Sequence, residues 1–393
     1  MYKVLTLNNI SVQGLARLPR ERYEVASDIG QPHGVLVRSA KMHDMELPSS
    51  VLAIGRAGAG TNNIPVDRMS ERGIPVFNAP GANANAVKEL VLAGMLLAAR
   101  NLCQAWHYTQ QLPGEGAALD KAVEEGKKRF VGSELPSRTL GVIGLGAIGV
   151  QVANAALTLG MRVIGFDPQI TVDRAWELSS GVEKARSLED LFSRADTISL
   201  HVPLFDATRG LVNKARLRLM PKDGVILNFA RGEIVDDAAL LAALASGKLR
   251  SYVTDFPSRR LLGNERVIAL PHLGASTEEA EVNCAIMVID TLRAYLEHGT
   301  IRHSVNFPDA DVPHNAAHRI TIANANVPNM VGQISTYLGD AGLNIADLLN
   351  KSRGNLAYTI VDLDGTPSAT VLDSIRRISG VLCVRDLGRA QSA

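Results

Sequence analysis

The sequence has few cysteines and almost no net charge, and both facts exclude classes of protein. Cys103, Cys284 and Cys383 are odd in number and far apart, without the spacing that a zinc site or a disulfide framework requires. We therefore predict no metal site and expect the cysteines to be buried small side chains. With 41 Lys and Arg against 40 Asp and Glu, the formal net charge is +1, so the chain has no basic field for nucleic acid.

Long apolar runs are also missing. The first residues, "MYKVLTLNNI", have no long apolar core after a basic start, and no later segment is long and apolar enough to span a bilayer. We expect a cytoplasmic protein without a membrane partner. A chain of 393 residues exceeds what one hydrophobic core usually holds, which predicts two or three domains.

The middle of the chain alternates between short apolar runs and helical patterns. Fully apolar strands separated by helices are typical of a parallel sheet covered on both faces. Residues 139–270 therefore predict a doubly wound α/β domain of the Rossmann type, with strands in "LGVIGLG", "RVIGFDP", "TISLHVP", "VILNFA", "SYVTDF" and "RVIALP". The first part of the chain predicts a second, smaller doubly wound (flavodoxin-like) unit, with strands in "KVLTLN", "GVLVRS", "VLAIGRA" and "IPVFNAP".

Two long apolar helical stretches, Ala86 to Asn101 and Glu281 to His298, lie where the two units join in sequence. The extended "IRHSVNFP" that follows predicts a return to the first unit, which is then discontinuous. We expect a first domain of residues 1–95 plus 284–307, a second of 96–283, and a linker at 308–316 that is rich in Pro, Asp and Asn. Residues 317–393 show the order βαββαβ, which predicts a small ferredoxin-like domain.

The stretch "VIGLGAIG" places three glycines, Gly144, Gly146 and Gly149, directly after a strand and at the start of a helix. The first glycine permits a tight turn, the second lets backbone amides reach a pyrophosphate, and the third lets helix and strand pack closely. Ala147 and Ile148 complete the turn, where the N-terminus of the helix attracts the anion. The pattern predicts a dinucleotide site.

The strand after this turn ends in Asp167, about 20 residues beyond the glycines. A carboxylate there binds both ribose hydroxyls of NAD and repels the 2′-phosphate of NADP. We therefore predict NAD as the cofactor of the second domain.

Two residues that follow later strands, Arg231 and His272, indicate the type of reaction. Arg231 follows the buried run "VILNFA" and His272 follows "RVIALP", so both are expected at the carboxyl ends of strands, where ligands bind in doubly wound sheets. A guanidinium grips a carboxylate by two parallel hydrogen bonds, and a histidine exchanges a proton with an adjacent hydroxyl near neutral pH. The pair suits hydride exchange between NAD and a 2-hydroxy acid.

Four motifs, "LGVIGLGAIG", "HVPL" with Thr208, "NFARGEIVDDAAL" and "LPHLGAST", resemble those of the D-isomer-specific 2-hydroxyacid dehydrogenases, and the tail resembles an ACT domain. The resemblance implies NAD-dependent oxidation of 3-phosphoglycerate to 3-phosphohydroxypyruvate, the entry to serine. It implies that Arg231 orients the substrate carboxylate and polarises the 2-oxygen, that His272 is the acid/base, and that Asp255 contacts the nicotinamide side of NAD. It also implies the cofactor contacts His201, Pro203, Thr208, Phe229, Ala230 and Gly274.

A phosphorylated substrate needs a second anion site, which we expect in the first domain. Arg38 lies in "VRSA", and Arg56 is followed by Ala57 and Gly58 in a loop at a strand end. Asn78 precedes a helix N-terminus, which also favours an anion.

Arg129, in "KKRFVGSEL", either reaches the substrate of a partner subunit or belongs to a solvated run of charge. The resemblance favours a homodimer or homotetramer that assembles through the dinucleotide domains.

The sequence departs from the family where an acid normally partners the catalytic histidine. The stretch "TDFPSRRLLGNER" has Arg259 and Arg260 at the expected position of that glutamate. Either Asp255 or Glu265 replaces it, or His272 acts without a carboxylate partner.

In the tail, "NANVPNMVGQISTYLGDAGLNI" resembles the amino-acid-binding edge of ACT domains. Asn324, Asn326 and Asn344 are predicted to meet at an interface between paired tails and to bind an effector, serine. The alternative is that these asparagines form turns and helix caps.

Two other functions stay open from the sequence. One alternative is a reductase for glyoxylate or hydroxypyruvate, in which Arg38 and Arg56 are structural. The other is a regulatory protein that senses NAD and has lost catalysis. Retention of both Arg231 and His272 argues against a pure sensor, which needs neither.

Overall fold

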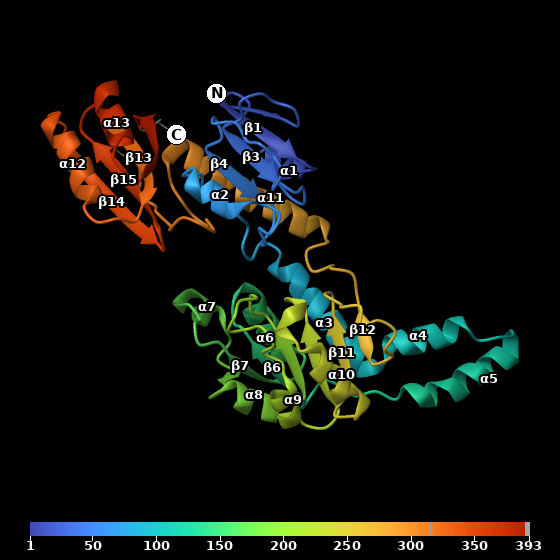
Figure 1. Cartoon of the computed structure of the whole chain (residues 1–393). Coiled ribbons are helices and arrows are strands. Elements are labelled where there is room, and N and C mark those ends of the chain that lie inside the picture. The colour runs from blue at the N-terminus through green and yellow to red at the C-terminus, as the bar shows by residue number, and fades with distance from the viewer. Residues whose placement is uncertain (315, 390–393) are drawn as a thin grey trace. The chain divides into compact units, whose positions relative to one another are not determined.

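The chain forms three sheets, and the computed structural model describes residues 1–314 and 316–389 (Figure 1). Asn315, in the expected linker, and residues 390–393, at the end of the expected third domain, lie outside the described residues. The chain divides into unit 1, which comprises residues 1–83 and 278–393, and unit 2, which comprises residues 84–277. These boundaries differ from the expected ones because residues 95/96 and 283/284 fall inside two continuous helices, α3 (Ala84–Arg100) and α11 (Glu278–His298).

Unit 2 has a seven-stranded parallel sheet in the order β12-β11-β10-β9-β6-β7-β8. Its strands are β6 (Thr139–Ile143), β7 (Arg162–Phe166), β8 (Val182–Lys184), β9 (Thr197–Leu200), β10 (Gly224–Asn228), β11 (Leu249–Thr254) and β12 (Val267–Ala269). The helices after the first strand are α6 (Ala147–Thr158), α7 (Val172–Glu177), α8 (Leu188–Arg194), α9 (Lys214–Leu219) and α10 (Asp237–Ala245). The expected Rossmann-type domain is confirmed, and β8 is an addition.

Unit 2 also contains a helical segment that the sequence patterns did not predict. Helix α4 (Leu102–Gln110) and helix α5 (Gly116–Gly126) precede a 3₁₀ turn at Lys127–Phe130. Trp106 on α4 is 66% exposed. No residue of α4 and only Gly126 of α5 is buried, so these two helices contribute little to a core.

The first sheet of unit 1 has five parallel strands in the order β2-β1-β3-β4-β5. The strands are β1 (Tyr2–Leu7), β2 (Tyr23–Ala26), β3 (Gly34–Val37), β4 (Ala53–Arg56) and β5 (Val76–Phe77), and the short helices are α1 (Val12–Leu15) and α2 (Val66–Glu71). The parallel sheet expected in the first part of the chain is therefore present, with β2 as an unexpected edge strand.

The second sheet of unit 1 is antiparallel, in the order β14-β15-β13-β16. Its elements follow each other as β13 (His318–Ala325), α12 (Met330–Asp340), β14 (Ile345–Arg353), β15 (Leu356–Leu363), α13 (Ala369–Arg376) and β16 (Val381–Gly388). This order confirms the ferredoxin-like βαββαβ fold.

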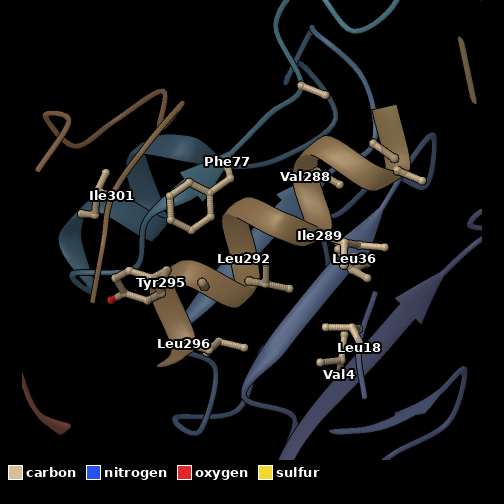
Figure 2. Close-up of a cluster of buried hydrophobic side chains, with 14 of the residues drawn as sticks. Val4, Leu18, Leu36, Phe77, Val288, Ile289, Leu292, Tyr295, Leu296 and Ile301 are labelled. Carbon is tan, nitrogen blue, oxygen red and sulfur yellow. The ribbon is translucent and has the colours of Figure 1, made fainter. Parts of the chain in front are cut away.

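Helix α11 fills the core of unit 1 (Figure 2). Its apolar side chains Val288, Leu292 and Leu296 are fully buried in the same cluster as Leu36 of β3 and Phe77 of β5. Tyr358 and Ile360 of β15 belong to that cluster too, so both sheets of unit 1 share one hydrophobic core.

The last turn of α11 is held by side chains of the antiparallel sheet. Arg385 donates to the carbonyl oxygens of Tyr295 and Leu296, both at 2.8 Å, and Arg319 donates to that of His298 at 3.1 Å. The Tyr358 hydroxyl donates to the next carbonyl, that of Gly299, at 2.8 Å. Carbonyls at a helix C-terminus lack helical partners and carry partial negative charge, so buried guanidinium groups satisfy them well.

The segment expected as a linker is packed against unit 1. Ala310 is fully buried and exchanges two backbone hydrogen bonds with Ile301, at 2.8 and 2.9 Å. Arg319, which is 0% exposed, donates to the carbonyl oxygens of Val312 and Pro313 and pairs with Asp362 through Nε at 2.6 Å and Nη2 at 2.7 Å. These contacts join the antiparallel sheet to the rest of unit 1.

Among residues 1–314 and 316–389, no helix has the length and apolar character needed to cross a bilayer. Within the same residues, no group of three or more His, Cys, Asp or Glu side chains is arranged to hold a metal ion.

We predict that Asp362→Ala lowers the free energy of unfolding by about 3–5 kcal/mol, because it leaves the buried Arg319 without its carboxylate. Denaturant unfolding checks this. The control is Asp373→Ala, which removes an ion pair with Arg376 on α13 whose side chains are 54% and 45% exposed, and which costs about 1 kcal/mol or less. Equal losses in the two variants would contradict the importance assigned to the buried pair.

Candidate active site

The turn from β6 into α6 is built from glycines for distinct reasons. Gly144 has a φ of +91°, and a Cβ there would lie 2.5 Å from the carbonyl oxygen of His201. A Cβ on Gly149 would lie 1.9 Å from the carbonyl oxygen of Gly144. A Cβ on Gly146 would meet no atom within 4 Å. Packing therefore demands Gly144 and Gly149, whereas Gly146 keeps the N-terminus of α6 accessible to a ligand.

Asp167 follows β7 and lies beside this turn. One carboxylate oxygen accepts a hydrogen bond from the backbone N–H of Leu145 and the other from that of Gln169, both at 2.8 Å. Asp167 lines a cavity of about 430 Å³ with Leu145, Phe166, Pro168 and other residues around β7 and β8. A hollow with an anchored carboxylate at its rim fits the adenosine half of NAD.

The loop after β9 contains three of the predicted cofactor contacts. Burial lowers the pKa of His201 to about 4, so its imidazole is neutral at physiological pH and lies 2.8 Å from the Ser199 hydroxyl. The buried Thr208 hydroxyl donates to the carbonyl oxygen of Pro203 at 2.6 Å and accepts from the Phe205 N–H at 3.0 Å. Thr208 thus shapes the loop rather than presenting a free hydroxyl.

Arg231 lies after the end of β10 in a turn that Asn228 holds. The fully buried Asn228 amide donates to the Arg231 carbonyl oxygen at 2.9 Å, and its oxygen accepts from the Ala230 N–H at 3.2 Å. The Arg231 side chain is exposed, with its guanidinium carbon 5.3 Å from the ring centre of Phe256. Arg231 is therefore available to an anion in solvent and does not occupy the core.

Phe256 contacts both Arg231 and His272, the two residues expected to act on the substrate. It follows β11, and its ring centre is 4.3 Å from that of His272, which follows β12. Because β10, β11 and β12 are adjacent parallel strands, Arg231, Phe256 and His272 emerge at one edge of the sheet. The structure thus places Arg231 and His272 against the same aromatic ring.

Asp255 is a carboxylate whose charge interacts with that of His272. It is 2% exposed, one oxygen accepts from the Gly274 N–H at 3.3 Å, and the other has no hydrogen-bond partner among the described residues. Burial raises the pKa of Asp255, and the nearby charge of His272 and the backbone N–H groups of Gly274 and Leu273 partly offset this rise. The unpartnered oxygen suits a donor from the nicotinamide side of NAD.

Glu265, the other acid considered for His272, precedes β12, whereas His272 follows it. The two residues therefore lie at opposite ends of β12. Arg259 and Arg260 are exposed. Asp255 is accordingly the better partner for His272.

The predicted phosphate site lies in unit 1, at the carboxyl ends of β3 and β4. Asn63 joins the two ends: its oxygen accepts from Arg56 Nε at 3.1 Å, and its amide donates to the carbonyl oxygens of Arg38 and Ala40, at 3.4 and 2.8 Å. Arg38 Nη2 lies 2.6 Å from Glu281 Oε1 at the start of α11.

The loop that follows Arg56 is fixed by backbone contacts. Ala57 donates to the Val37 carbonyl oxygen at 2.8 Å, and Gly58 accepts from the Ala79 N–H at 3.0 Å. A Cβ on Gly58 would lie 2.4 Å from Arg56 Nη1, so only glycine lets this guanidinium lie against the loop. Asn78 donates to the Ala59 carbonyl oxygen at 2.5 Å.

The remaining predicted residues lie elsewhere. Arg129 places its guanidinium 5.2 Å from the ring centre of Tyr108 in unit 2. In the antiparallel sheet, Asn344 donates to Asp364 at 2.6 Å, beside the start of β13, whereas Asn324 lies near its end and Asn326 just after it. The register separates the two ends by about 20 Å, so the three asparagines do not meet within one chain.

Four structurally important residues were missed from the sequence: Asn228, Phe256, Asn63 and Glu281. A buried amide at the end of an apolar strand is a signal that could have found Asn228, because such an amide must bind nearby backbone groups. The other three depend on contacts between separate strand ends or with a distant helix, which local patterns do not contain.

Comparison with known proteins supports the assignment. Residues 92–274 match the model of the D-isomer specific 2-hydroxyacid dehydrogenase, NAD binding domain. A D-3-phosphoglycerate dehydrogenase of Haemophilus influenzae is 33% identical over 87% of this chain and 83% of its own length. The chain belongs to the D-isomer specific 2-hydroxyacid dehydrogenase family.

Other relatives agree. A D-3-phosphoglycerate dehydrogenase of Methanocaldococcus jannaschii is 38% identical over 81% of this chain, but the match spans only 59% of that relative's length. The crystal structure of NAD⁺-bound 3-phosphoglycerate dehydrogenase from Entamoeba histolytica has a TM-score of 0.59 and 26% identity, and it covers 78% of this chain and 98% of that chain. The expected NAD-binding domain is confirmed by the family model and fits the glycine turn, Asp167 and the unpartnered Asp255 oxygen.

We predict that Asp167→Ala weakens the preference for NADH over NADPH, because the carboxylate that repels a 2′-phosphate is removed. The ratio of kcat/KM for the two cofactors measures this preference. The control is Asp173→Ala, which removes an exposed carboxylate in the first turn of the nearby α7. An unchanged ratio in Asp167→Ala would contradict the role assigned to Asp167.

We also predict a shift of the pH profile in Asp255→Asn, which keeps the shape of the side chain and removes its charge. Reduction needs protonated His272, and a nearby anion favours that form. Reduction should therefore fade at a lower pH than in the parent, and oxidation should persist to lower pH. Glu265→Gln is the control at the opposite edge of the sheet; an equal shift in both variants would exclude a specific pairing with Asp255.

Proposed function

We propose that this protein oxidises 3-phospho-D-glycerate to 3-phosphohydroxypyruvate with NAD, the entry step to serine. The observation that carries the proposal is the placement of Arg231, Phe256 and His272 at one edge of the NAD-binding sheet. The names of the relatives support the choice of substrate, since both the Haemophilus and the Methanocaldococcus proteins are D-3-phosphoglycerate dehydrogenases.

The proposed substrate carries two anionic groups, a carboxylate and a phosphate. Arg231 binds the carboxylate through two parallel hydrogen bonds and polarises the 2-oxygen. Arg38 and Arg56, joined by Asn63, bind the phosphate. A substrate without phosphate engages only the first set, which is why phosphate distinguishes this function from reduction of glyoxylate or hydroxypyruvate.

His272 accepts the proton of the substrate 2-hydroxyl during oxidation and returns it during reduction. Bound NAD supplies the acceptor for the hydride that leaves carbon 2. Phe256 restricts the His272 ring by packing at 4.3 Å, and Asp255 stabilises the imidazolium that oxidation produces. Protons and electrons then balance: one proton moves to His272 and one hydride leaves with the cofactor.

A steady-state assay tests the proposal directly. The purified protein is supplied with NAD and either 3-phospho-D-glycerate or D-glycerate, and formation of NADH is followed. We expect NADH with the phosphorylated acid and a kcat/KM lower by about 10- to 100-fold without the phosphate, the value of charge-assisted hydrogen bonds. Equal rates with both acids would contradict the phosphate site.

We further propose that the antiparallel sheet of unit 1 is an ACT domain that binds serine across two copies of the chain, with the dinucleotide domains also joining copies. Asn344 lies at one end of the sheet, and Asn324 and Asn326 lie at the other. This arrangement supports a site between two copies, in which one copy contributes Asn344 and the other contributes Asn324 and Asn326. Asn324 supports a polar ligand, since it is 1% exposed and its side-chain oxygen has no partner among the described residues. Arg129 is the residue proposed to act in the partner subunit.

Arg231→Lys should lower kcat/KM by about 10²-fold, because lysine keeps the charge but loses the planar fork that orients the carboxylate. The parent and variant are compared in the same NADH assay. Retained NADH binding, measured by fluorescence titration, separates a defect in substrate orientation from misfolding. An unchanged kcat/KM would remove Arg231 from the site.

Asn344→Ala should abolish the response to serine and leave kcat unchanged in its absence, if the tail is a separate effector site. Isothermal calorimetry with serine measures the binding. Asn350→Ala is the control, since Asn350 lies in the same strand and donates to Thr359 within the sheet. Serine binding that survives in Asn344→Ala would place the effector elsewhere.

A further inference from the structure

Glu281 forms an ion pair with Arg38, one of the two arginines proposed to bind phosphate. It lies in the first turn of α11, and its Oε1 is 2.6 Å from Nη2 of Arg38. The register pairs Val37 of β3 with Arg56 of β4, so Arg38 and Arg56 leave adjacent strand ends. One carboxylate of the same unit therefore sits among the cations of the proposed phosphate site.

The buried Cys284, one turn further along α11, supports this placement. Burial raises the pKa of the Cys284 thiol. The positive charges of Arg56 and Arg38 lower this pKa, and the negative charge of Glu281 raises it. The start of α11 thus faces both strand ends. The thiol is neutral, so Glu281 contributes the negative charge of this group.

The ion pair between Arg38 and Glu281 is partly exposed to solvent, so a stronger anion can displace the carboxylate. The two side chains are 35% and 44% exposed, and exposed pairs of this kind contribute little net free energy because solvent screens them. A phosphate dianion offers Arg38 more charge and more acceptor oxygens than one carboxylate does. Binding of phosphate then moves Glu281 away from Arg38 or leaves two anions beside each other, and both outcomes weaken the binding.

We propose that Glu281 is a specificity-determining residue that competes with the substrate phosphate for Arg38. The proposal rests on the function proposed above, in which Arg38 and Arg56 bind phosphate. A group without sufficient negative charge does not displace Glu281, so the carboxylate makes this site selective for strongly anionic substrates. Its removal should improve binding of phosphate, a gain that misfolding cannot produce.

The test compares Glu281→Gln with the parent and with Glu279→Gln. Glu279 lies in the same first turn of α11 and is exposed, so its variant removes the same charge without removing the pair with Arg38. KM and kcat are measured for reduction of 3-phosphohydroxypyruvate and of hydroxypyruvate with NADH. Inorganic phosphate is used as a competitive inhibitor of 3-phosphohydroxypyruvate reduction.

We expect Glu281→Gln to lower both the KM for 3-phosphohydroxypyruvate and the inhibition constant of phosphate by about two- to fivefold, with no such gain for hydroxypyruvate. Glu279→Gln should change either constant by less than about twofold. A KM for the phosphorylated substrate that stays the same or rises in Glu281→Gln, or an equal gain in both variants, would overturn the proposal. A parent that does not reduce 3-phosphohydroxypyruvate would instead contradict the proposed function.

Discussion

The geometry of unit 1 depends on how helix α11 is held at its two ends. Its apolar face fills the core shared by both sheets, and its last carbonyls accept hydrogen bonds from Arg319, Arg385 and Tyr358 of the antiparallel sheet. Its first turn carries Glu281, which pairs with Arg38. A single helix therefore connects the ferredoxin-like part of unit 1 with the proposed phosphate site.

In unit 2, the parallel alignment of the strands determines which side chains lie close together. Because β10, β11 and β12 end at the same edge, Arg231, Asp255 and His272 gather there although up to 41 residues separate them in sequence. The Phe256 ring contacts both the guanidinium and the imidazole. The carboxylate of Asp255 is buried, and one of its oxygens has no hydrogen-bond partner within residues 1–314 and 316–389.

Much of this arrangement could be predicted from the sequence, because the decisive signals are local. The glycines at 144, 146 and 149 require a tight turn, Asp167 ends the next strand, and apolar runs mark the strands whose ends carry Arg231 and His272. The order of elements from residue 318 onward also appears in the sequence as alternating periods, and the ferredoxin-like fold is confirmed.

What the sequence could not provide depends on contacts between distant segments. The docking of the antiparallel sheet on α11 needs Arg319 and Arg385, which resemble surface arginines in sequence but are 0% and 7% exposed. Residues 308–313 look like a linker by composition, yet Ala310 is buried against Ile301. The choice of Asp255 over Glu265 likewise required knowing at which end of β12 each acid lies.

Arg56→Ala offers the most direct measurement of the central claim, that this family member acts on a phosphorylated acid. The kcat/KM values for 3-phosphohydroxypyruvate and hydroxypyruvate are compared in the parent and the variant. We predict a loss of about 10- to 100-fold for the phosphorylated substrate and less than about twofold for hydroxypyruvate, because only the former loses a charge-assisted contact. Equal losses on both substrates would show that Arg56 is structural and would contradict the account.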